Sequence, residues 1–288
     1  MIPGPFEYHR PTSVAEAVGL LGKLGEEARV VAGGHSLIPM MKLRMAVPEH
    51  LIDLQDLSDL KFIREDGGDL VIGAMTTQAE VIASDLLAKK CPILAETALQ
   101  IADPQVRSLG TLGGNVANGD PGNDMPAVMQ ALDASYELSG PDGARQVGAR
   151  EFYEGAFFTT RGEDEILTAV RIPAPAAGHG WCYAKQKRKV GDYATAAAAV
   201  ILSMSGGKCT AASIGLTNVS QTPLHAEAAS QALVGTALDK AALDRAAEEA
   251  MAITDPANDG RGPAEFRRKV AGVMVRRAVE CARDRAAG

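Results

Sequence analysis

The chain has 288 residues, of which 46% are hydrophobic and 23% charged, a composition typical of a soluble globular protein with a large core. A net charge of −7 argues against a nucleic-acid-binding function, which depends on clustered Lys and Arg. The four cysteines are scattered without a Cys-x-x-Cys pair. This spacing excludes a self-contained zinc ribbon or iron–sulfur cluster and predicts unpaired thiols.

The N-terminal sequence lacks the basic and apolar regions of a signal peptide. The longest apolar run, Ala194 to Met204, is shorter than the about 20 residues that a membrane-spanning helix needs. We therefore expect a cytoplasmic protein. The basic run KQKRK, residues 185–189, is interpreted as an exposed strand edge that carries protective charge.

The first segment is predicted to fold as a β-α-β unit. A capping box, Ser13 with Glu16, begins a helix that ends at Gly25. A short buried strand then leads into the double glycine Gly33-Gly34, Ser36 is predicted to cap a short helix, and residues 50–54 form a second strand.

A hairpin and several helices are predicted next. Strands on both sides of Gly67-Gly68 have the spacing of a two-residue turn. Thr77 with Glu80 forms a second capping box, and Pro92 begins a helix that extends to residue 102. After a glycine-rich loop, the sequence predicts a helix over 124–133 and strands over 134–140 and 165–173.

A Pro-, Ala- and Gly-rich linker over residues 173–178 marks a domain boundary near residue 177. Beyond it, three antiparallel strands are predicted over 180–190, 195–207 and 208–219, the last two joined at Gly206-Gly207. The rest is predicted to be helical, over 225–235, 239–253 and 263–287. The expected domains are therefore 1–177 and 178–288.

Two short segments combine glycine pairs with hydrogen-bonding side chains: AGGHS, residues 32–36, and TLGGN, residues 111–115. Glycine lets the backbone approach a ligand closely, and successive N–H groups at a helix start attract a phosphate. A single glycine pair is usually an ordinary turn, but two such segments in one domain, both flanked by Ser, Thr or Asn, favour a ligand site. Neither fits the P-loop or the G-x-G-x-x-G pattern, so the remaining hypothesis is a diphosphate held by main-chain amides. A side chain at Gly33 or Gly114 is then expected to obstruct the phosphate.

Residues for hydrolytic chemistry are not evident, because the sequence shows neither a Ser-His-Asp order nor an HExxH helix. His35 lies between the double glycine and the predicted cap, so its main-chain N–H is expected to matter more than its ring. We predict no catalytic side chain and no metal site.

Three longer stretches carry a family resemblance: AGGHSLIPMMKLR, IADPQVRSLGTLGGNVANGDPGNDMPAVM and KRKVGDYATAAAAV. They resemble the FAD-binding subunits of the molybdenum hydroxylases, the xanthine dehydrogenase-like family, and most of all its carbon monoxide dehydrogenase branch. The resemblance implies an α+β fold like that of vanillyl-alcohol oxidase, with two α/β subdomains, about 1–56 and 57–177. A C-terminal domain of a three-stranded antiparallel sheet with a helical bundle completes it.

The resemblance also implies a set of cofactor-binding residues. The FAD pyrophosphate would be bound by Ala32, Gly33, Gly34, His35 and Ser36, and by Thr111, Leu112, Gly113, Gly114 and Asn115. Four further positions would contact the cofactor: Asp124, Leu167, Lys185 and Tyr193.

Each of these four positions has an alternative role. Asp124 could interact with a helix dipole, Leu167 could be a core residue, Lys185 a surface lysine and Tyr193 a residue at the edge of the core. As a flavin contact, Tyr193 would stack its ring on the isoalloxazine.

In function, the resemblance implies an electron-transfer subunit. It would accept electrons on FAD from [2Fe-2S] clusters of a small subunit and pass them to a quinone or similar acceptor. A large molybdopterin subunit would oxidise carbon monoxide, and the expected assembly is a dimer of heterotrimers, in the cytoplasm or at the inner face of its membrane. Two alternatives stay open: another substrate, aromatic, heterocyclic or aldehyde, and a flavin-free binding module whose glycine segments are turns only.

Overall fold

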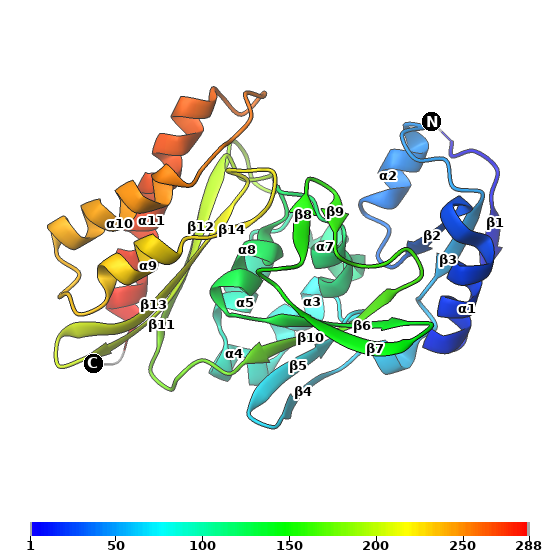
Figure 1. Cartoon of the computed structure of the whole chain (residues 1–288), viewed down its shortest axis with the longest axis horizontal. Coiled ribbons are helices and arrows are strands. Elements are labelled where there is room, and N and C mark those ends of the chain that lie inside the picture. Colours follow the sequence, from blue (N-terminus) through cyan, green and yellow to red (C-terminus); the bar gives the residue numbers. More distant parts are fainter. Residues whose placement is uncertain (1, 287–288) are drawn as a thin grey trace.

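The computed structural model describes residues 2–286 and shows an elongated α+β protein built along three principal sheets. The N-terminal sheet lies at one end, a larger sheet lies in the middle and the C-terminal sheet with its helices lies at the other end (Figure 1). No helix in residues 2–286 combines the length and apolar character that crossing a membrane requires. All four cysteines are free thiols.

The N-terminal subdomain is a parallel sheet of order β1-β3-β2 with a helix against it. Its elements are β1 (Glu7–His9), α1 (Val14–Leu24), a 3-10 turn (Gly25–Glu27), β2 (Ala28–Val31), α2 (Leu37–Lys42) and β3 (His50–Asp53). The Ser13 hydroxyl accepts from the Glu16 N–H, as predicted for a cap (3.1 Å). The Glu16 carboxylate accepts from the Thr12 N–H rather than from Ser13, so only half of the predicted capping box forms.

The middle sheet is antiparallel, in the order β4-β5-β10-β6-β7. A 3-10 turn (Ser58–Leu60) leads into it, and its strands are β4 (Ile63–Asp66), β5 (Asp69–Gly73), β6 (Ser135–Gly140), β7 (Gly143–Gly148) and β10 (Ile166–Pro173). Gly67 and Gly68 have φ of +61° and +93°, which confirms the predicted hairpin turn. Strand β7 and the ribbon β8 (Tyr153–Gly155) with β9 (Phe158–Thr159) were not predicted; β7 is largely exposed and polar, so it lacks an apolar alternation.

Six short helices accompany this sheet, and all of them except α6 supply side chains to the largest core. They are α3 (Gln78–Ala83), α4 (Asp85–Lys90), α5 (Ile93–Ala98), α6 (Pro104–Leu109), α7 (Leu112–Ala117) and α8 (Asp124–Ala131). The Thr77–Glu80 capping box is complete, as predicted. The helix predicted from Pro92 to residue 102 is shorter and ends at Ala98, and the segment predicted as a glycine-rich loop contains α7.

The C-terminal sheet has the order β11-β12-β13-β14. Its strands are β11 (Gly180–Gln186), β12 (Ala196–Ser205), β13 (Lys208–Thr217) and β14 (Leu224–His225), followed by α9 (Glu227–Leu233), α10 (Lys240–Ala252) and α11 (Ala264–Arg285). The prediction of three strands was incomplete, because β14 has only two residues and no strand signature of its own. The last residue of the predicted helix 263–287 and the end of the predicted C-terminal domain lie outside the described residues, as does residue 1.

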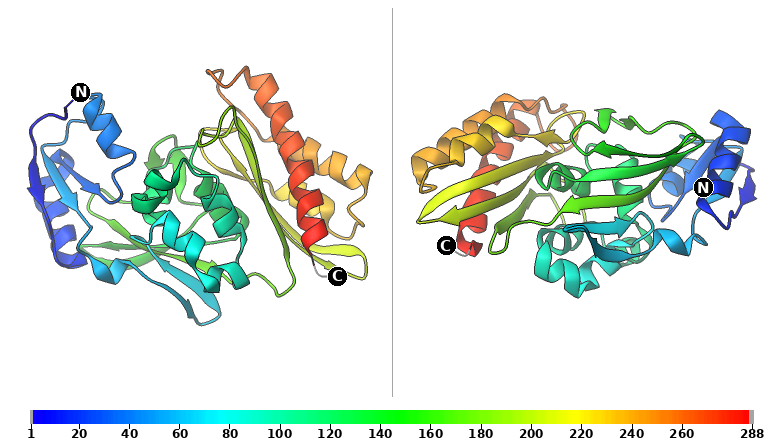
Figure 2. Two further views of the ribbon diagram at one scale, coloured as in Figure 1. Left: turned by 180° about the vertical axis from the view of Figure 1, so that it is seen from behind. Right: turned by 60° about the horizontal axis from the view of Figure 1, so that its bottom comes forward.

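Strand β12 joins two hydrophobic cores. Ala197 and Ala199 face the core that holds α8, whereas Ala196 and Ala198 face the core that holds α10 and α11. Small side chains let helices approach both faces of the sheet: a Cβ at Gly215 of β13 would collide with a carbonyl of α8. Seen from behind, α11 lies across the outer face of this sheet and the central helices lie on the inner face (Figure 2). The two predicted domains are therefore packed directly on each other.

Candidate cofactor site

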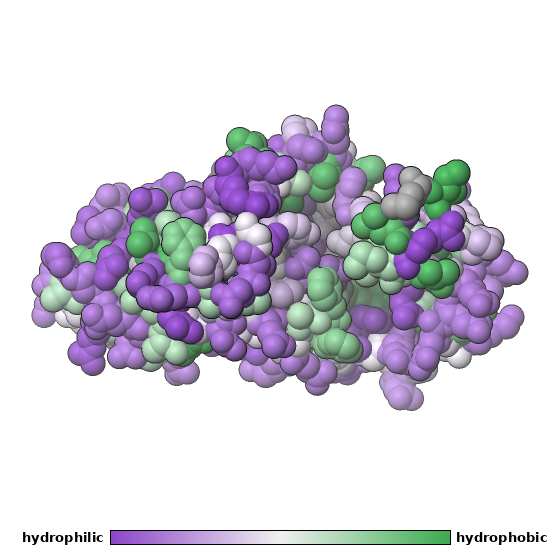
Figure 3. All heavy atoms as spheres, turned by 90° about the horizontal axis from the view of Figure 1, so that it is seen from above, coloured by the Kyte–Doolittle hydropathy of each residue, from purple (hydrophilic) through white to green (hydrophobic). Residues whose placement is uncertain are grey.

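The structure brings the two glycine segments together, although about eighty residues separate them in the chain. Residues 32–36 follow the end of β2, and residues 111–115 begin α7. A Cβ at Gly33 would collide with the Leu109 carbonyl and lie 2.7 Å from the Cα of Gly110, and one at Gly114 would lie 3.9 Å from the Ala32 Cβ. Seen from above, the surface is hollowed between the N-terminal subdomain and the middle of the molecule (Figure 3).

The first glycine segment has unpaired donors. Within the described part of the chain, the N–H groups of Gly33, Gly34, His35 and Ser36 donate to no protein acceptor. Gly34 has φ +74°, a backbone conformation that glycine adopts most readily. The prediction that Ser36 caps α2 was wrong, because its side chain makes no capping hydrogen bond. Four neighbouring N–H groups are thus left for a ligand.

The second glycine segment uses its donors inside the protein. The Leu112 N–H donates to the Thr76 carbonyl (2.9 Å) and the Gly113 N–H donates to the Ala74 carbonyl (2.9 Å). The Gly114 N–H donates to the Thr111 hydroxyl (3.0 Å), which caps α7. Four amides at this helix start would otherwise lack partners, so the fold itself accounts for most of them.

The groups that lie close to the glycines of both segments also differ from expectation, because they belong to the protein itself. Gly33 allows Leu109 and Gly110 to approach, and Gly113 allows Ala74 to approach. At Gly114 a Cβ would lie 2.8 Å from the capping hydroxyl of Thr111. A side chain at Gly33 or Gly114 would therefore disturb protein contacts directly, which corrects the expectation that it would obstruct only a phosphate.

Asp124 and Lys185, two of the predicted site residues, form a buried ion pair. The Lys185 Nζ lies 2.7 Å from the Asp124 Oδ2, and their side chains are 1% and 6% exposed. The Tyr183 hydroxyl donates to the other oxygen of Asp124 (2.5 Å). Burial raises the pKa of Asp124 above its ordinary value, and Lys185 and the Tyr183 hydrogen bond oppose this shift.

Lys185 is therefore not a surface lysine, and the interpretation of residues 185–189 as one exposed strand edge was wrong. Lys185 points inward from β11 and also donates to the Gln100 carbonyl (3.3 Å), while Lys187 to Lys189 follow the end of the strand. Tyr183 was missed in the sequence, although it shares a face of β11 with Lys185 two residues on.

Leu167 and the helix start at Asp124 match the alternatives that the sequence left open. Leu167 is 5% exposed, belongs to the largest core and lies at an irregularity in the pairing of β10 with β6. Asp124 is the first residue of α8, where a carboxylate interacts favourably with the helix dipole. Neither position contradicts a cofactor contact.

Tyr193 lies in the connection between β11 and β12 and is 44% exposed. Its ring lies over Gly122, where an added Cβ would be 2.7 Å from the Tyr193 Cδ1, and the Arg261 guanidinium carbon lies 5.6 Å from the ring centre. Burial and the neighbouring Asp120 carboxylate raise the pKa of the Tyr193 hydroxyl to about 12. The ring is thus held from one side and stays neutral at physiological pH.

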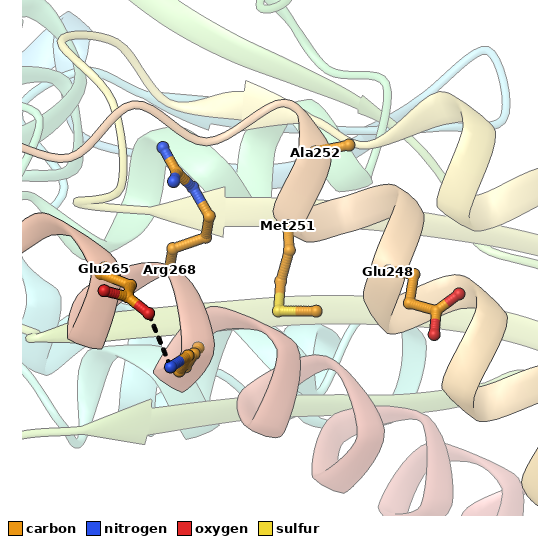
Figure 4. Close-up of a pocket in the computed structure, with 6 residues that line it drawn as sticks. Glu248, Met251, Ala252, Glu265 and Arg268 are labelled. Carbon is orange, nitrogen blue, oxygen red and sulfur yellow. Dashed lines mark ion pairs between the residues drawn. The ribbon is translucent and has the colours of Figure 1, made fainter.

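A groove of about 650 Å³ lies elsewhere, between α10 and α11. It is lined by Glu248, Met251, Ala252, Glu265, Arg268 and Lys269. Glu265 forms an ion pair with Lys269 four residues further along α11 (2.7 Å), which Figure 4 marks with a dashed line from Glu265. This open surface groove brings together none of the predicted site residues.

Comparison with known families defines the class of the protein. Residues 4–175 match the FAD binding domain in molybdopterin dehydrogenase, and residues 181–282 match the CO dehydrogenase flavoprotein C-terminal domain. The chain belongs to the family of FAD-binding flavoproteins that these two domains define. The family resemblance and the mixed α/β fold predicted from the sequence are thereby confirmed.

Individual relatives narrow the class further. The chain is 68% identical to the carbon monoxide dehydrogenase medium chain of Afipia carboxidovorans, over 99% of both chains. It is 50% identical to the carbon monoxide dehydrogenase medium chain of Hydrogenophaga pseudoflava, over 100% of both. A chain in the crystal structure of the cyanide-inactivated Cu,Mo-CO dehydrogenase is 68% identical and superposes with a TM-score of 0.99, covering 99% of this chain and 100% of that one.

Proposed function

We propose that this chain is the FAD-carrying electron-transfer subunit of a molybdenum-containing carbon monoxide dehydrogenase. The observation that carries this proposal is the row of unpaired N–H groups at residues 33–36, placed against the second glycine segment. It occurs in a chain 68% identical to a carbon monoxide dehydrogenase medium chain. FAD, when bound, supplies the redox chemistry, and the chain supplies binding and orientation.

The residues present fit a diphosphate. Gly33, Gly34, His35 and Ser36 offer adjacent main-chain donors at the start of α2, where an anion is stabilised without a basic side chain. The residues that lead into the second glycine segment, Leu109 and Gly110, pack closely against Gly33 and so help to fix the position of these donors. This division of roles departs from a site in which both segments bind the phosphates through their amides.

The remaining predicted residues fit the other parts of the cofactor. Tyr193 presents a half-exposed, neutral ring suited to contact with a flat π-system. The Asp124–Lys185 pair lies deeper and fixes α8 against β11. We assign it to holding the site in place and to polar contact with the flavin, together with Leu167 on β10.

Partner subunits complete the proposed electron path. An iron–sulfur subunit with [2Fe-2S] clusters donates electrons, a molybdopterin subunit oxidises carbon monoxide, and a quinone or similar acceptor receives the electrons. The scattered cysteines of this chain agree with that division, because they offer no cluster site in the sequence. We propose a dimer of heterotrimers in the cytoplasm or at the inner face of its membrane.

Co-expression with the proposed molybdopterin and iron–sulfur subunits tests the proposal. We expect a complex with one FAD per copy of this chain that reduces a dye or quinone when supplied with carbon monoxide. Activity only on an aldehyde or an aromatic heterocycle would replace the substrate assignment. Absence of flavin absorption, even after reconstitution with FAD, would leave the flavin-free binding module as the better hypothesis.

A further inference from the structure

A second cluster of side chains lies at the opposite end of the N-terminal sheet from the glycine segments. Strands β1 and β3 are parallel, with Glu7 paired to His50 and His9 two residues further along. Side chains two residues apart in a strand lie on the same face, so Glu7, His9 and His50 converge. His50 also pairs with Ala28 at the start of β2, whereas residues 32–36 follow the end of that strand.

The three side chains are close enough to share one ion. His9 Nε2 lies 3.2 Å from His50 Nδ1, and His50 Nδ1 lies 3.5 Å from Glu7 Oε2. One ligand atom from each residue lies within 4.8 Å of the other two. A tetrahedral ion with bonds of about 2.0–2.1 Å holds its ligand atoms about 3.3 Å apart. The two short distances therefore match the edges of such a tetrahedron.

The chemistry of the ligand atoms selects the kind of ion. Two imidazoles and one carboxylate suit Zn²⁺ and neighbouring first-row metals, whereas Mg²⁺ and Ca²⁺ prefer oxygen ligands alone. The His50 side chain is 15% exposed and held by its strand, while the Glu7 carboxylate is 74% exposed. A largely covered His50 beside an exposed carboxylate gives an ion both a fixed ligand and a path of entry.

Hydrogen bonding alone is the alternative account of the cluster. In that case His9 and His50 share a proton, and Glu7 pairs with a protonated His50. Both partners would then approach the same nitrogen, His50 Nδ1. A metal ion in that place would instead be contacted by one lone pair from each residue.

We propose that Glu7, His9 and His50 form a binding site for a divalent transition metal ion, with Zn²⁺ as its representative ligand. A water molecule completes the tetrahedron on the exposed side. The ion links the edge strand β1 to β3 and so stabilises the subdomain that carries the first glycine segment. This proposal does not depend on carbon monoxide chemistry or on FAD binding.

Metal titration of the full-length chain tests the proposal. After chelator treatment and dialysis, Zn²⁺ binding is followed by calorimetry, and Co²⁺ binding by its visible bands beyond the flavin absorption. We expect one tight equivalent per chain, a higher melting temperature with Zn²⁺ and tetrahedral Co²⁺ bands. His9→Gln and His50→Gln should each weaken Zn²⁺ binding by about 100-fold, and Glu7→Gln by about tenfold because water can replace the exposed carboxylate.

Matched controls separate this site from general histidine or carboxylate binding. Glu49→Gln removes a neighbouring exposed carboxylate, and His225→Gln removes a histidine of the C-terminal sheet. Both should bind Zn²⁺ as the wild-type chain does. Equal affinity in wild type and in the His9→Gln/His50→Gln double variant would overturn the proposal, as would absence of the tight equivalent in wild type.

A measurement on the wild-type chain covers the case in which a variant fails to fold. X-ray absorption at the zinc edge should show nitrogen and oxygen neighbours at about 2.0–2.1 Å with an imidazole pattern. Sulfur neighbours at about 2.3 Å would assign the ion to the cysteines instead and reject the site.

Discussion

The two glycine segments have similar sequences but opposite uses of their main chain. Residues 33–36 keep their N–H groups unpaired, whereas Leu112, Gly113 and Gly114 donate theirs to Thr76, Ala74 and Thr111. A glycine pair therefore indicates that another group comes close to the backbone, but the pattern does not show whether that group is a ligand or another part of the protein. In the first segment the donors are free for a ligand; in the second the approaching group is the protein itself.

This difference predicts how each side tolerates change. On the second side, Asn115 accepts from the Met125 N–H (3.3 Å), which links the segment to α8 and its buried Asp124. A substitution in the second segment should therefore lower the stability of the fold more than the affinity for FAD. A substitution in the first segment should lower the affinity for FAD more than the stability.

The largest effect is expected from Lys185→Met, which leaves the buried Asp124 carboxylate without its cation. Stability at neutral pH should fall by about 3–5 kcal/mol. Loss of Lys185 also raises the pKa of Asp124 further, because only the Tyr183 hydrogen bond and the charge of Lys187 then oppose the effect of burial. A carboxyl with a raised pKa in the folded state favours folding fully below its unfolded pKa and loses that contribution as pH rises, so the deficit should grow from about pH 4 toward pH 7.

Urea unfolding across that pH range measures the effect. The double variant Lys185→Met/Asp124→Asn is the control, since it removes the titrating carboxyl. Its stability deficit relative to the wild-type chain should change little with pH. A deficit that stays constant with pH would contradict the buried ion pair as its cause.

A smaller but clear loss is expected from Gly113→Val. The new Cβ would lie 2.5 Å from the Ala74 Cβ and 2.6 Å from its carbonyl oxygen, and neither group can move easily. Unfolding free energy should fall by about 2–3 kcal/mol, measured in urea with FAD in excess. Gly22→Val, at an exposed site in α1 with no neighbouring atom within 4 Å, should change it by about 0.5 kcal/mol at most. Equal stability of the two variants would contradict a packing role for the second segment.

The smallest change in stability is expected from Gly34→Ala, which tests the first segment. A φ of +74° costs alanine about 1 kcal/mol, and the altered backbone should lower FAD affinity by about tenfold. Gly207→Ala is the control for the backbone strain alone, because Gly207 has φ +75° with open space around it, whereas a Cβ at Gly34 would also lie 2.6 Å from the Ile38 Cδ1. It should lose stability from the backbone strain and keep FAD affinity, measured by flavin fluorescence titration. Unchanged affinity in both variants would count against the first segment as the phosphate site.

Local features of the fold were predictable because neighbouring residues determine them. The turns at Gly67-Gly68 and Gly206-Gly207 require positive φ at both positions, and both glycine pairs adopt it. The Thr77–Glu80 box needs only residues three apart. Strand β14 and ribbon β8–β9 depend on tertiary pairing, so these short segments carry no periodic pattern of their own.

The residues of the candidate site could be predicted from the sequence, but the contacts between them could not. The resemblance named Asp124 and Lys185, while the charge run around Lys185 suggested a surface position. Only the contacts of both side chains with Asp124 on α8 show that Lys185 and Tyr183 face inward together. The pairing of Glu7 with His50 likewise depends on the parallel alignment of β1 and β3, which the sequence does not encode as a motif.

Strand β12, with two alanines toward each core, joins the two predicted domains into one structural unit. Its inner residues contact the core of the preceding domain and its outer residues contact the C-terminal helices. A protease that cuts the connection near residue 177 would therefore release no separate halves without unfolding both. A cofactor bound on the N-terminal side consequently lies beside a C-terminal domain that is fixed in place and does not close over it as a lid.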